Sequence, residues 1–462
     1  MKITIASIAI LFTLSLSCLV FGFGFKGTFF SIDPDVVYVA NAISFIQTQQ
    51  IHYTDHPGTP AIILISAALA PVRIYTKIIL HINFVDWAFN HYDFLIFYVR
   101  IIFTGLFALS TYIFLYSINY KKFSWAKTIL TLLILSSFSA FLRLSVSISP
   151  ESILYLTTSI WIWIYESKIR LRNFLLGLIA GLAFATKFTG LFLVIASVLT
   201  GGVYSLIGTV VGFFAGIFPV LSKYNSLISW TLSLAKGTGV HGGGSQTIFD
   251  LGVYFESFKS LIYQEPGLII MFILFLFKKR SKVGLVIIFG ILLFAKFPLS
   301  YYQTSNFLLL AYIFMSTYPE YSKIVKSCIL TIFLFLGILN ISGYLLNIDK
   351  QVSGTSNLEM YIANNHAKIA TYWAWGRTKD FSLLWARTWA GGLYKGHTEG
   401  AKLFDFDPNS NEDIFEKCWD KIYLLDQLIS DFNNKYENKY RYFVTSIPDS
   451  GNMNLIESDH CI

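Results

Sequence analysis

The chain has 462 residues, of which 55% are hydrophobic and 13% are charged, with a mean hydropathy of +0.58. Soluble domains carry about 25% charged residues, so this composition excludes an ordinary soluble protein and indicates a polytopic membrane protein. The net charge of +8 does not indicate a nucleic-acid partner, because the basic residues lie in short clusters between apolar runs and form no basic face.

Residues 1–24 form the first predicted transmembrane helix. The apolar run is longer than the ~7–15 residues of a signal-peptide core and lacks a convincing cleavage site, so an uncleaved span is expected. Further runs of membrane-spanning character lie near 94–117, 127–142, 153–165, 173–186, 188–204, 206–221, 267–277, 283–295, 306–317 and 327–346. The sequence therefore predicts about eleven transmembrane helices.

Residues 61–80 can be read either as a span or as an amphipathic helix at the membrane interface, because Pro71, Arg73 and Lys77 interrupt the apolar run. The basic clusters between the other spans are 121–127, 167–172, 278–282 and 323–326. The interfacial alternative places Lys2 and all these clusters on one side, as the positive-inside rule requires. It predicts a multi-pass protein of the plasma (inner) membrane with a cytoplasmic N-terminus.

The predicted fold class is an all-α polytopic membrane protein with a small α/β extracytoplasmic C-terminal domain. Residues 1–346 are expected to form the transmembrane domain. Its outward-facing parts include a first outer loop at 25–93 and a long outer loop at 222–266.

The polar tail at 347–462 is expected to form the outer domain. Its sequence predicts an amphipathic helix at 412–435 and a strand at 440–446. A disulfide between Cys418 and Cys461 is compatible with a tail outside the cytosol.

The first outer loop holds the acidic pair Asp33 and Asp35 on either side of Pro34. Such a turn can aim one or both carboxylates into a cavity beside the membrane, and the alternative is that one of them caps the following helix. Two imidazoles and a carboxylate follow at His52, Asp55 and His56.

Those three residues are a weak signal for zinc, so no metal site is predicted from them. The favoured interpretation is that Asp55 and His56 hydrogen-bond within the loop or help to bind an anionic ligand.

Cations at or inside the predicted spans form a second set: Arg100, Arg143, Lys187 and Lys296. A charged side chain inside a bilayer costs about 2.5–3.5 kcal/mol, so each is a candidate functional residue. The alternative for Lys187 and Lys296 is that the long side chain reaches out to the interface. Carboxylates and cations at one membrane face suit a lipid-linked phosphate substrate.

A glycine-rich segment, "AKGTGVHGGGSQT", occupies residues 235–247 of the long outer loop. Its glycines permit close approach of the backbone to a ligand, although the P-loop pattern is absent. A lid or substrate loop is favoured over a plain linker.

Five segments together resemble the GT-C superfamily of membrane glycosyltransferases, in the branch of protein O-mannosyltransferases and aminoarabinose transferases. They are "DPDVVYVANAISFIQTQQIHYTDHPGTP" in the first outer loop, "SISPESILYL" at 147–156, "GLAFATKFTGLFLV" at 181–194, "TGVHGGG" at 238–244 and "KFPLSYYQTSNFLL" at 296–309. Their order and common sidedness over residues 1–350 carry the resemblance.

The resemblance implies an inverting transferase that takes a sugar from a polyprenyl-phosphate donor on the outer face. Asp33 or Asp35 would be the general base. The family shows adjacent Asp-Glu where this chain has Asp33-Pro34-Asp35, so both aspartates are retained. The implied partners are the donor, membrane lipids and a glycan, lipid or protein acceptor. No cofactor is obligatory, and a divalent cation stays open.

Site roles follow from the same resemblance. Arg100, Lys187 and Lys296 would contact the donor phosphate. The expected substrate-lining residues are Tyr38, His56, His241, Tyr301 and Tyr302. The competing function is a transporter or flippase of lipid-linked glycans, which predicts charges in the middle of spans and inverted repeats. The charges here lie at outer ends, and no repeat is evident.

Overall fold

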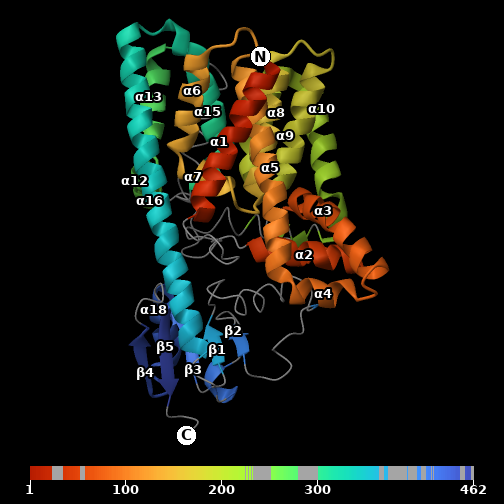
Figure 1. Ribbon diagram of the computed structural model, residues 1–462, viewed down its shortest axis with the longest axis vertical. Coiled ribbons are helices and arrows are strands. Elements are labelled where there is room, and N and C mark those ends of the chain that lie inside the picture. The colour runs from red at the N-terminus through yellow and green to blue at the C-terminus, as the bar shows by residue number, and fades with distance from the viewer. Residues whose placement is uncertain are drawn as a thin grey trace. The chain divides into compact units, whose positions relative to one another are not determined.

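The computed structural model describes residues 1–22, 35–52, 58–223, 225–226, 228–229, 232, 251–278, 300–363, 369–372, 393, 403–406, 413–417, 419, 421–447 and 453–458 (Figure 1). The chain divides into two units. The first, here the transmembrane unit, comprises Met1–Leu19, Thr54–Ala68 and Tyr98–Tyr344. The second unit comprises Val20–Tyr53, Leu69–Phe97 and Leu345–Ile462.

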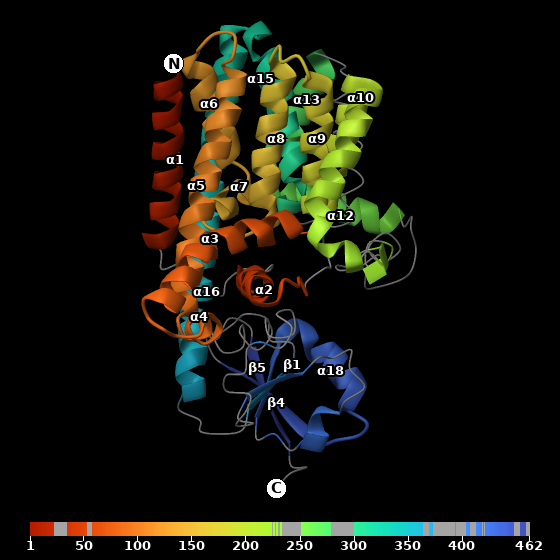
Figure 2. The ribbon, with the colours of Figure 1, turned by 90° about the vertical axis from the view of Figure 1, so that its right-hand side faces the viewer.

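Long helices run side by side in the transmembrane unit (Figure 2). They are α1 (Lys2–Gly22), α5 (Tyr92–Ile118), α6 (Trp125–Ser136), α8 (Pro150–Glu166), α9 (Arg172–Thr186), α10 (Leu191–Ile217), α13 (Gly267–Lys278), α15 (Thr304–Thr317) and the first part of α16 (Lys323–Ala363). Helix α8 packs against α9 and α15, and α9 packs against α10.

Further elements lie between these helices in the chain. They are α3 (Thr59–Ile78), α7 (Ser139–Leu144), η1 (Phe188–Gly190), η2 (Phe218–Lys223), α12 (Leu251–Gln264), η4 (Ser300–Gln303) and η5 (Tyr318–Glu320).

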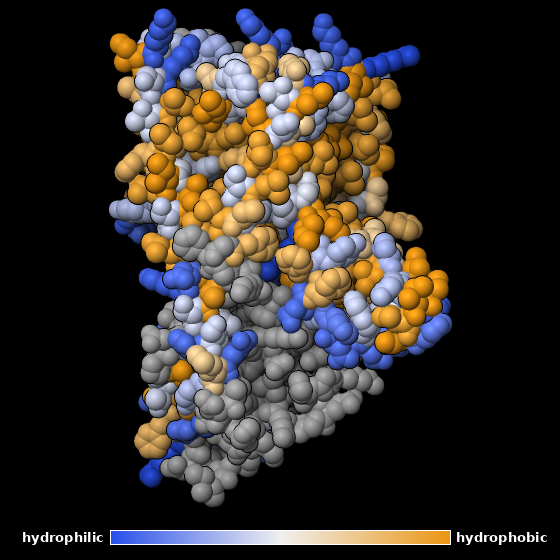
Figure 3. Space-filling view, in the orientation of Figure 1, coloured by the Kyte–Doolittle hydropathy of each residue, from blue (hydrophilic) through white to orange (hydrophobic). Residues whose placement is uncertain are grey.

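The surface of the transmembrane unit is apolar over most of its height, and hydrophilic side chains project from the end that carries the N-terminus (Figure 3). Within the described residues, five helices are long and apolar enough to cross a membrane: Lys2–Phe21, Thr59–Ile78, Tyr92–Ile118, Phe188–Lys223 and Lys323–Tyr361. An apolar surface of this kind is stable in lipid and not in water. The chain is therefore a multi-pass membrane protein.

Glycines allow α9 and α10 to pack at very short range. A Cβ atom at Gly177 would lie 1.8 Å from the carbonyl oxygen of Ser205, and one at Gly181 would lie 2.1 Å from that of Thr209. Gly208 and Gly212 meet α9 in the same way. Small residues spaced by four are the usual means of close helix contact in membranes. This contact fixes the end of α9, where Lys187 follows.

The predicted span at 127–142 is broken in the structure. Helix α6 ends at Ser136, and α7 begins at Ser139. The hydroxyls of Ser136 and Ser137 donate to the carbonyls of Leu132 and Ile134 at 2.9 and 2.8 Å. Serine side chains that bond to the backbone compete with the helical pattern, and here they accompany the break.

The ambiguous run at 61–80 is helical as α3, with Pro71 inside the helix. Its mean hydropathy of 1.6 is the lowest of the five candidate spans. An interfacial position for α3 stays a prediction, as do the count of eleven spans and the sidedness of the termini.

The second unit contains α2 (Asp35–Thr48) and α4 (Phe84–Asn90). The Tyr92 hydroxyl donates to the Val36 carbonyl at 2.5 Å, which ties the first turn of α2 to the start of α5. The backbone N–H of His52 donates to the side chain of Asn41 at 3.0 Å. These bonds hold the α2 segment within its unit.

A mixed five-stranded sheet of order β2-β1-β3-β5-β4 forms the C-terminal part of the second unit. Its strands are β1 (Ile369–Tyr372), β2 (Leu403–Phe406), β3 (Lys421–Leu425), β4 (Tyr442–Ser446) and β5 (Met453–Ser458). Strand β1 pairs in parallel with β2 and β3, and β5 pairs antiparallel with β3 and β4. The predicted fold class, all-α with a small α/β C-terminal part, is confirmed.

The predicted helix at 412–435 is wrong. This segment contains η7 (Ile414–Lys417), β3, η8 (Asp426–Leu428) and the short helix α18 (Ile429–Tyr436). Ile422, Tyr423 and Leu424 are all buried, because β3 is a central strand with both faces covered. Such a strand lacks polar alternation and imitates a helix in a sequence pattern. The predicted strand at 440–446 is confirmed as β4.

The predicted domain boundary at 346 falls inside α16, which continues as one helix from Lys323 to Ala363. Cys418 and Cys461 lie outside the described residues.

Candidate active site

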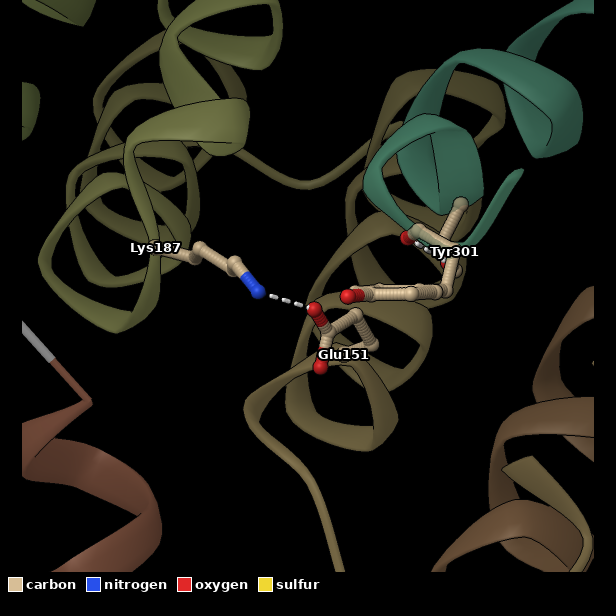
Figure 4. A network of polar contacts seen from close by, with 4 residues as sticks. Glu151, Lys187 and Tyr301 are labelled. Atoms are coloured by element: carbon tan, nitrogen blue, oxygen red, sulfur yellow. Dashed lines mark hydrogen bonds and ion pairs between the residues drawn. The ribbon is translucent and has the colours of Figure 1, made fainter. Parts of the chain in front are cut away.

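Lys187 and Glu151 form a buried ion pair in the transmembrane unit (Figure 4). Their side chains are 6% and 1% exposed. Lys187 follows the last residue of α9, and Glu151 lies in the first turn of α8. The pair thus joins two helix ends. The alternative in which the Lys187 side chain reaches out to the interface is wrong, because the side chain points inward to the carboxylate.

Local sequence explains where each helix end lies. Pro150 occupies the first turn of α8, where its missing N–H costs nothing, and the helix N-terminus favours the negative charge of Glu151. At Lys187 the backbone is extended, with φ −158° and ψ 144°, so α9 stops there. The N–H of Gly58 donates to the carbonyl of Thr186 at 2.8 Å. Gly58 has a φ of 49°, a conformation that favours glycine.

Two tyrosine rings from η4 cover the ammonium of Lys187. The nitrogen lies 4.3 Å from the ring centroid of Tyr302 and 5.3 Å from that of Tyr301. The guanidinium of Arg143 lies 4.3 Å from the Tyr301 centroid. Ring faces attract cations, most strongly where water is excluded. The predicted residues Lys187, Tyr301 and Tyr302 are therefore brought together, with Arg143 beside them.

A second buried carboxylate, Glu265, joins η4 to α7. It accepts hydrogen bonds from the Ser139 N–H at 3.0 Å and from the Ser139 hydroxyl, and that hydroxyl lies 2.8 Å from the hydroxyl of Ser300. Burial raises the pKa of Glu265 to about 7, although these hydrogen bonds oppose the shift. Ser139 begins the helix that carries Arg143, and Ser300 immediately precedes Tyr301. Glu265 thus fixes α7, which carries Arg143, and η4, which carries Tyr301.

Several buried polar atoms near the ion pair have no hydrogen-bond partner within the described part of the chain. They are Oε2 of Glu151 and the hydroxyls of Ser147, Ser149, Ser152 and Thr189. A buried polar atom without a partner is costly, and such atoms mark sites where a ligand or water completes the bonding. These groups surround the start of α8 and the residues after Lys187, so the site can receive a polar ligand.

Arg100 is buried in α5, with 2% of its surface exposed. One helical turn further along, the Thr104 hydroxyl donates to the carbonyl of Ser145 at 2.9 Å. Residues four apart lie on one face of a helix. The face of α5 that carries Arg100 therefore meets the segment that leads from α7 into Glu151.

The remaining predicted site residues lie either in the second unit or outside the described residues. Asp35 and Tyr38 are buried in α2 of the second unit, with 0% and 1% of their surface exposed. The candidates Asp33, His56, His241 and Lys296 lie outside the described residues. No cluster of three or more metal-ligand residues occurs in the described part of the chain.

Glu151 and Glu265 were not among the predicted site residues. A signal existed for Glu151: it follows Pro150 directly at a helix start, in a chain with only 27 acidic residues. Glu265 likewise lies next to a proline, Pro266. Its partner Ser139, however, is more than a hundred residues away in the chain, and its partner Ser300 is 35 residues away. No local pattern reveals such contacts.

No protein-family model and no curated protein matches this chain. Among solved structures, it is similar to the crystal structure of ArnT from Cupriavidus metallidurans bound to undecaprenyl phosphate. The TM-score is 0.54 at 11% sequence identity, and the match covers 97% of this chain and 98% of that chain. The likeness extends over both units and shows that the two chains share one fold.

Proposed function

We propose that the protein is an integral membrane glycosyltransferase that transfers a sugar from a polyprenyl-phosphate donor to a glycan, lipid or protein acceptor. The observation that carries this proposal is the buried Lys187–Glu151 pair beneath two tyrosine rings, at the ends of apolar helices. A buried cation at the end of a membrane helix suits the phosphate of a lipid. The shared fold with ArnT, whose crystal structure holds undecaprenyl phosphate, supports this donor class.

The proposed reaction is a single displacement with inversion. Asp33 or Asp35 takes the proton from the acceptor hydroxyl, whose oxygen then bonds to the anomeric carbon of the sugar. The bond from that carbon to the phosphate oxygen breaks, and the polyprenyl phosphate leaves with the electron pair. Negative charge therefore develops on the phosphate in the transition state.

Lys187 and Arg100 are proposed to stabilise that charge, together with Lys296. A cation held in place before the reaction stabilises developing charge without the cost of reorientation. Glu151 holds the Lys187 ammonium in place. Tyr301 and Tyr302 exclude water from the same ammonium, which strengthens its attraction for an anion.

The site faces the outer side of the plasma membrane, with the N-terminus in the cytoplasm and the C-terminal unit outside. Tyr38, His56 and His241 line the substrate. The proposed reaction has no obligatory metal. Sugar transfer after chelation tests whether a divalent cation contributes.

The test is sugar transfer in membranes that express the wild type, Asp33→Asn or Asp35→Asn. Radiolabelled undecaprenyl-phosphate hexose, pentose and aminopentose serve as donors. Removal of the base is expected to lower transfer at least about 100-fold in one of the two variants. Asp349→Asn is the matched control, because Asp349 is an exposed carboxylate of α16. Full activity in both first-loop variants would contradict the base assignment.

A further inference from the structure

A pocket with a volume of about 190 Å³ lies at the other end of the transmembrane unit. Three lysines line it: Lys121 and Lys122, in the loop between α5 and α6, and Lys127 in α6. Glu166 and Tyr312 complete its polar wall. Nothing in the proposed glycosyl transfer uses these residues.

The pocket is separate from the candidate active site. Helix α8 carries Glu151 in its first turn and Glu166 as its last residue. Fifteen residues at a rise of about 1.5 Å place these two carboxylates about 22 Å apart along the helix. The active-site pair and the lysine pocket therefore lie at opposite ends of the same helix.

The charges at the pocket do not balance. The carboxylate of Glu166 accepts a hydrogen bond from the Tyr312 hydroxyl, and its other oxygen lies 3.8 Å from the ammonium of Lys121. Among the described residues that line the pocket, Glu166 is the only acidic one, whereas three are lysines. Like charges gathered in one pocket repel one another, so an anion bound there lowers the electrostatic energy.

The size and position of the pocket indicate which anion fits. At about 30 Å³ per water molecule, the volume corresponds to about six waters, which is enough for a phosphate group and below the roughly 300–1,000 Å³ of sites for larger ligands. Tyr120, which lines the pocket, is 36% exposed, and Trp125, the first residue of α6, is 57% exposed. Exposed tryptophan and tyrosine at helix ends are typical of the level of lipid headgroups.

We propose that the pocket of Lys121, Lys122 and Lys127 binds a phosphate group, as carried by an anionic membrane phospholipid. Basic pockets between transmembrane helices at the membrane surface recognise such headgroups. Free phosphate carries the same chemical group and is the other source that the test distinguishes.

The test uses the full chain, delipidated and returned to nanodiscs of phosphatidylcholine with or without phosphatidylglycerol. Native mass spectrometry counts retained phosphatidylglycerol, and a separate titration with inorganic phosphate measures protection of the lysines from acetylation. The pocket variant replaces Lys121, Lys122 and Lys127 by Gln. The control variant replaces three basic residues that do not line the pocket: Lys168, Lys323 and Lys326.

The pocket variant is expected to bind phosphatidylglycerol about 100-fold more weakly than the wild type, because each of the three lysines removed contributes a factor of about five. The control variant is expected to bind as the wild type does. Glu166→Gln removes the one carboxylate and is expected to tighten binding about fivefold, which supplies a gain that misfolding cannot produce.

Each outcome either supports or overturns the proposed phosphate site. Selective loss in the pocket variant supports a lipid ligand, whereas lysine protection by inorganic phosphate without retained phosphatidylglycerol supports a soluble one. Equal retention in the pocket and control variants, with no protection by inorganic phosphate, overturns the proposal.

Discussion

The ammonium of Lys187 and the carboxylate of Glu151 meet where α9 ends and α8 begins, and both side chains are almost fully buried. Transfer of two charges out of water costs several kcal/mol for each ion, and a buried pair adds little net stability. An ion pair in such a place therefore indicates a functional demand for the cation. In our account that demand is the phosphate of the donor.

Replacement of Glu151 by Gln should both destabilise the fold and impair transfer. The change leaves the Lys187 ammonium buried without its carboxylate, which costs about 3–5 kcal/mol. The double variant Lys187→Met/Glu151→Gln should recover much of that stability, because no unpaired charge remains, but transfer should stay at least about 100-fold below the wild type. Thermal unfolding in detergent and sugar transfer measure the two effects separately.

The control for the Glu151 and Lys187 variants is Lys168→Met, since Lys168 is an exposed lysine just beyond α8. It should leave both stability and transfer unchanged. Recovery of transfer in the double variant would show that the reaction does not need the Lys187 charge.

The aromatic cover of Lys187 yields a second prediction. Tyr302→Phe keeps the ring face 4.3 Å from the ammonium, whereas Tyr302→Leu removes it. Loss of a desolvated cation–π contact costs about 2 kcal/mol, so the Leu variant should lose about 30-fold in transfer, and the Phe variant should stay close to the wild type. Transfer rates at saturating and limiting donor measure this difference. Equal losses in both variants would assign the effect to the hydroxyl.

The close packing of α9 on α10 is tested by a matched pair of glycines. Gly181→Ala places a methyl group 2.1 Å from the Thr209 carbonyl oxygen, so α9 must shift, at a cost of about 1–3 kcal/mol. At Gly105 in α5 a Cβ atom meets nothing within 4 Å, so Gly105→Ala should be neutral or stabilising by up to about 1 kcal/mol. The fluorescence of the ten tryptophans reports the melting temperature of each variant. Equal melting temperatures would contradict the packing argument.

The stability of the protein is expected to depend on pH through Glu265. Burial raises the pKa of Glu265 from its ordinary value of 4.5 to about 7, so the folded state keeps a proton that the unfolded state loses. Stability from this group is therefore complete below pH 4.5 and falls as pH rises to about 7, by about 3 kcal/mol in all. Glu265→Gln imitates the protonated carboxyl and should remove this part of the pH dependence.

Thermal unfolding in detergent at about pH 5 and about pH 8 measures the Glu265 effect. Glu256→Gln is its control, because that carboxylate of α12 is 70% exposed. An unchanged pH dependence in Glu265→Gln would rule out Glu265 as its source.

Much of the architecture could be predicted from the sequence, because apolar runs of membrane length and a polar tail are local properties. The broken span at 127–142 and the strand β3 inside the predicted helix at 412–435 could not. Serine bonds to the backbone accompany the break in the first. Burial on both faces of a sheet, which depends on distant strands, gives the second its apolar run.

The site could be predicted in part for the same reason. A lysine at the end of an apolar run is conspicuous, so Lys187 was predicted. Tyr301 and Tyr302 were predicted from a segment that resembles the GT-C superfamily. Glu151 supplies the charge that Lys187 needs, yet the two are separated by 36 residues in the chain. A contact of that kind depends on how α8 and α9 pack, which no local pattern specifies.

Sugar transfer from a polyprenyl-phosphate donor is tested most directly by release of undecaprenyl phosphate from the purified protein in nanodiscs, supplied with radiolabelled undecaprenyl-phosphate sugars and a cell-envelope acceptor extract. The wild type is expected to release undecaprenyl phosphate as labelled acceptor accumulates, and Lys187→Ala is expected to lower both at least about 100-fold. Movement of the intact labelled donor across the bilayer, with neither product formed, would rule out glycosyl transfer and identify a transporter.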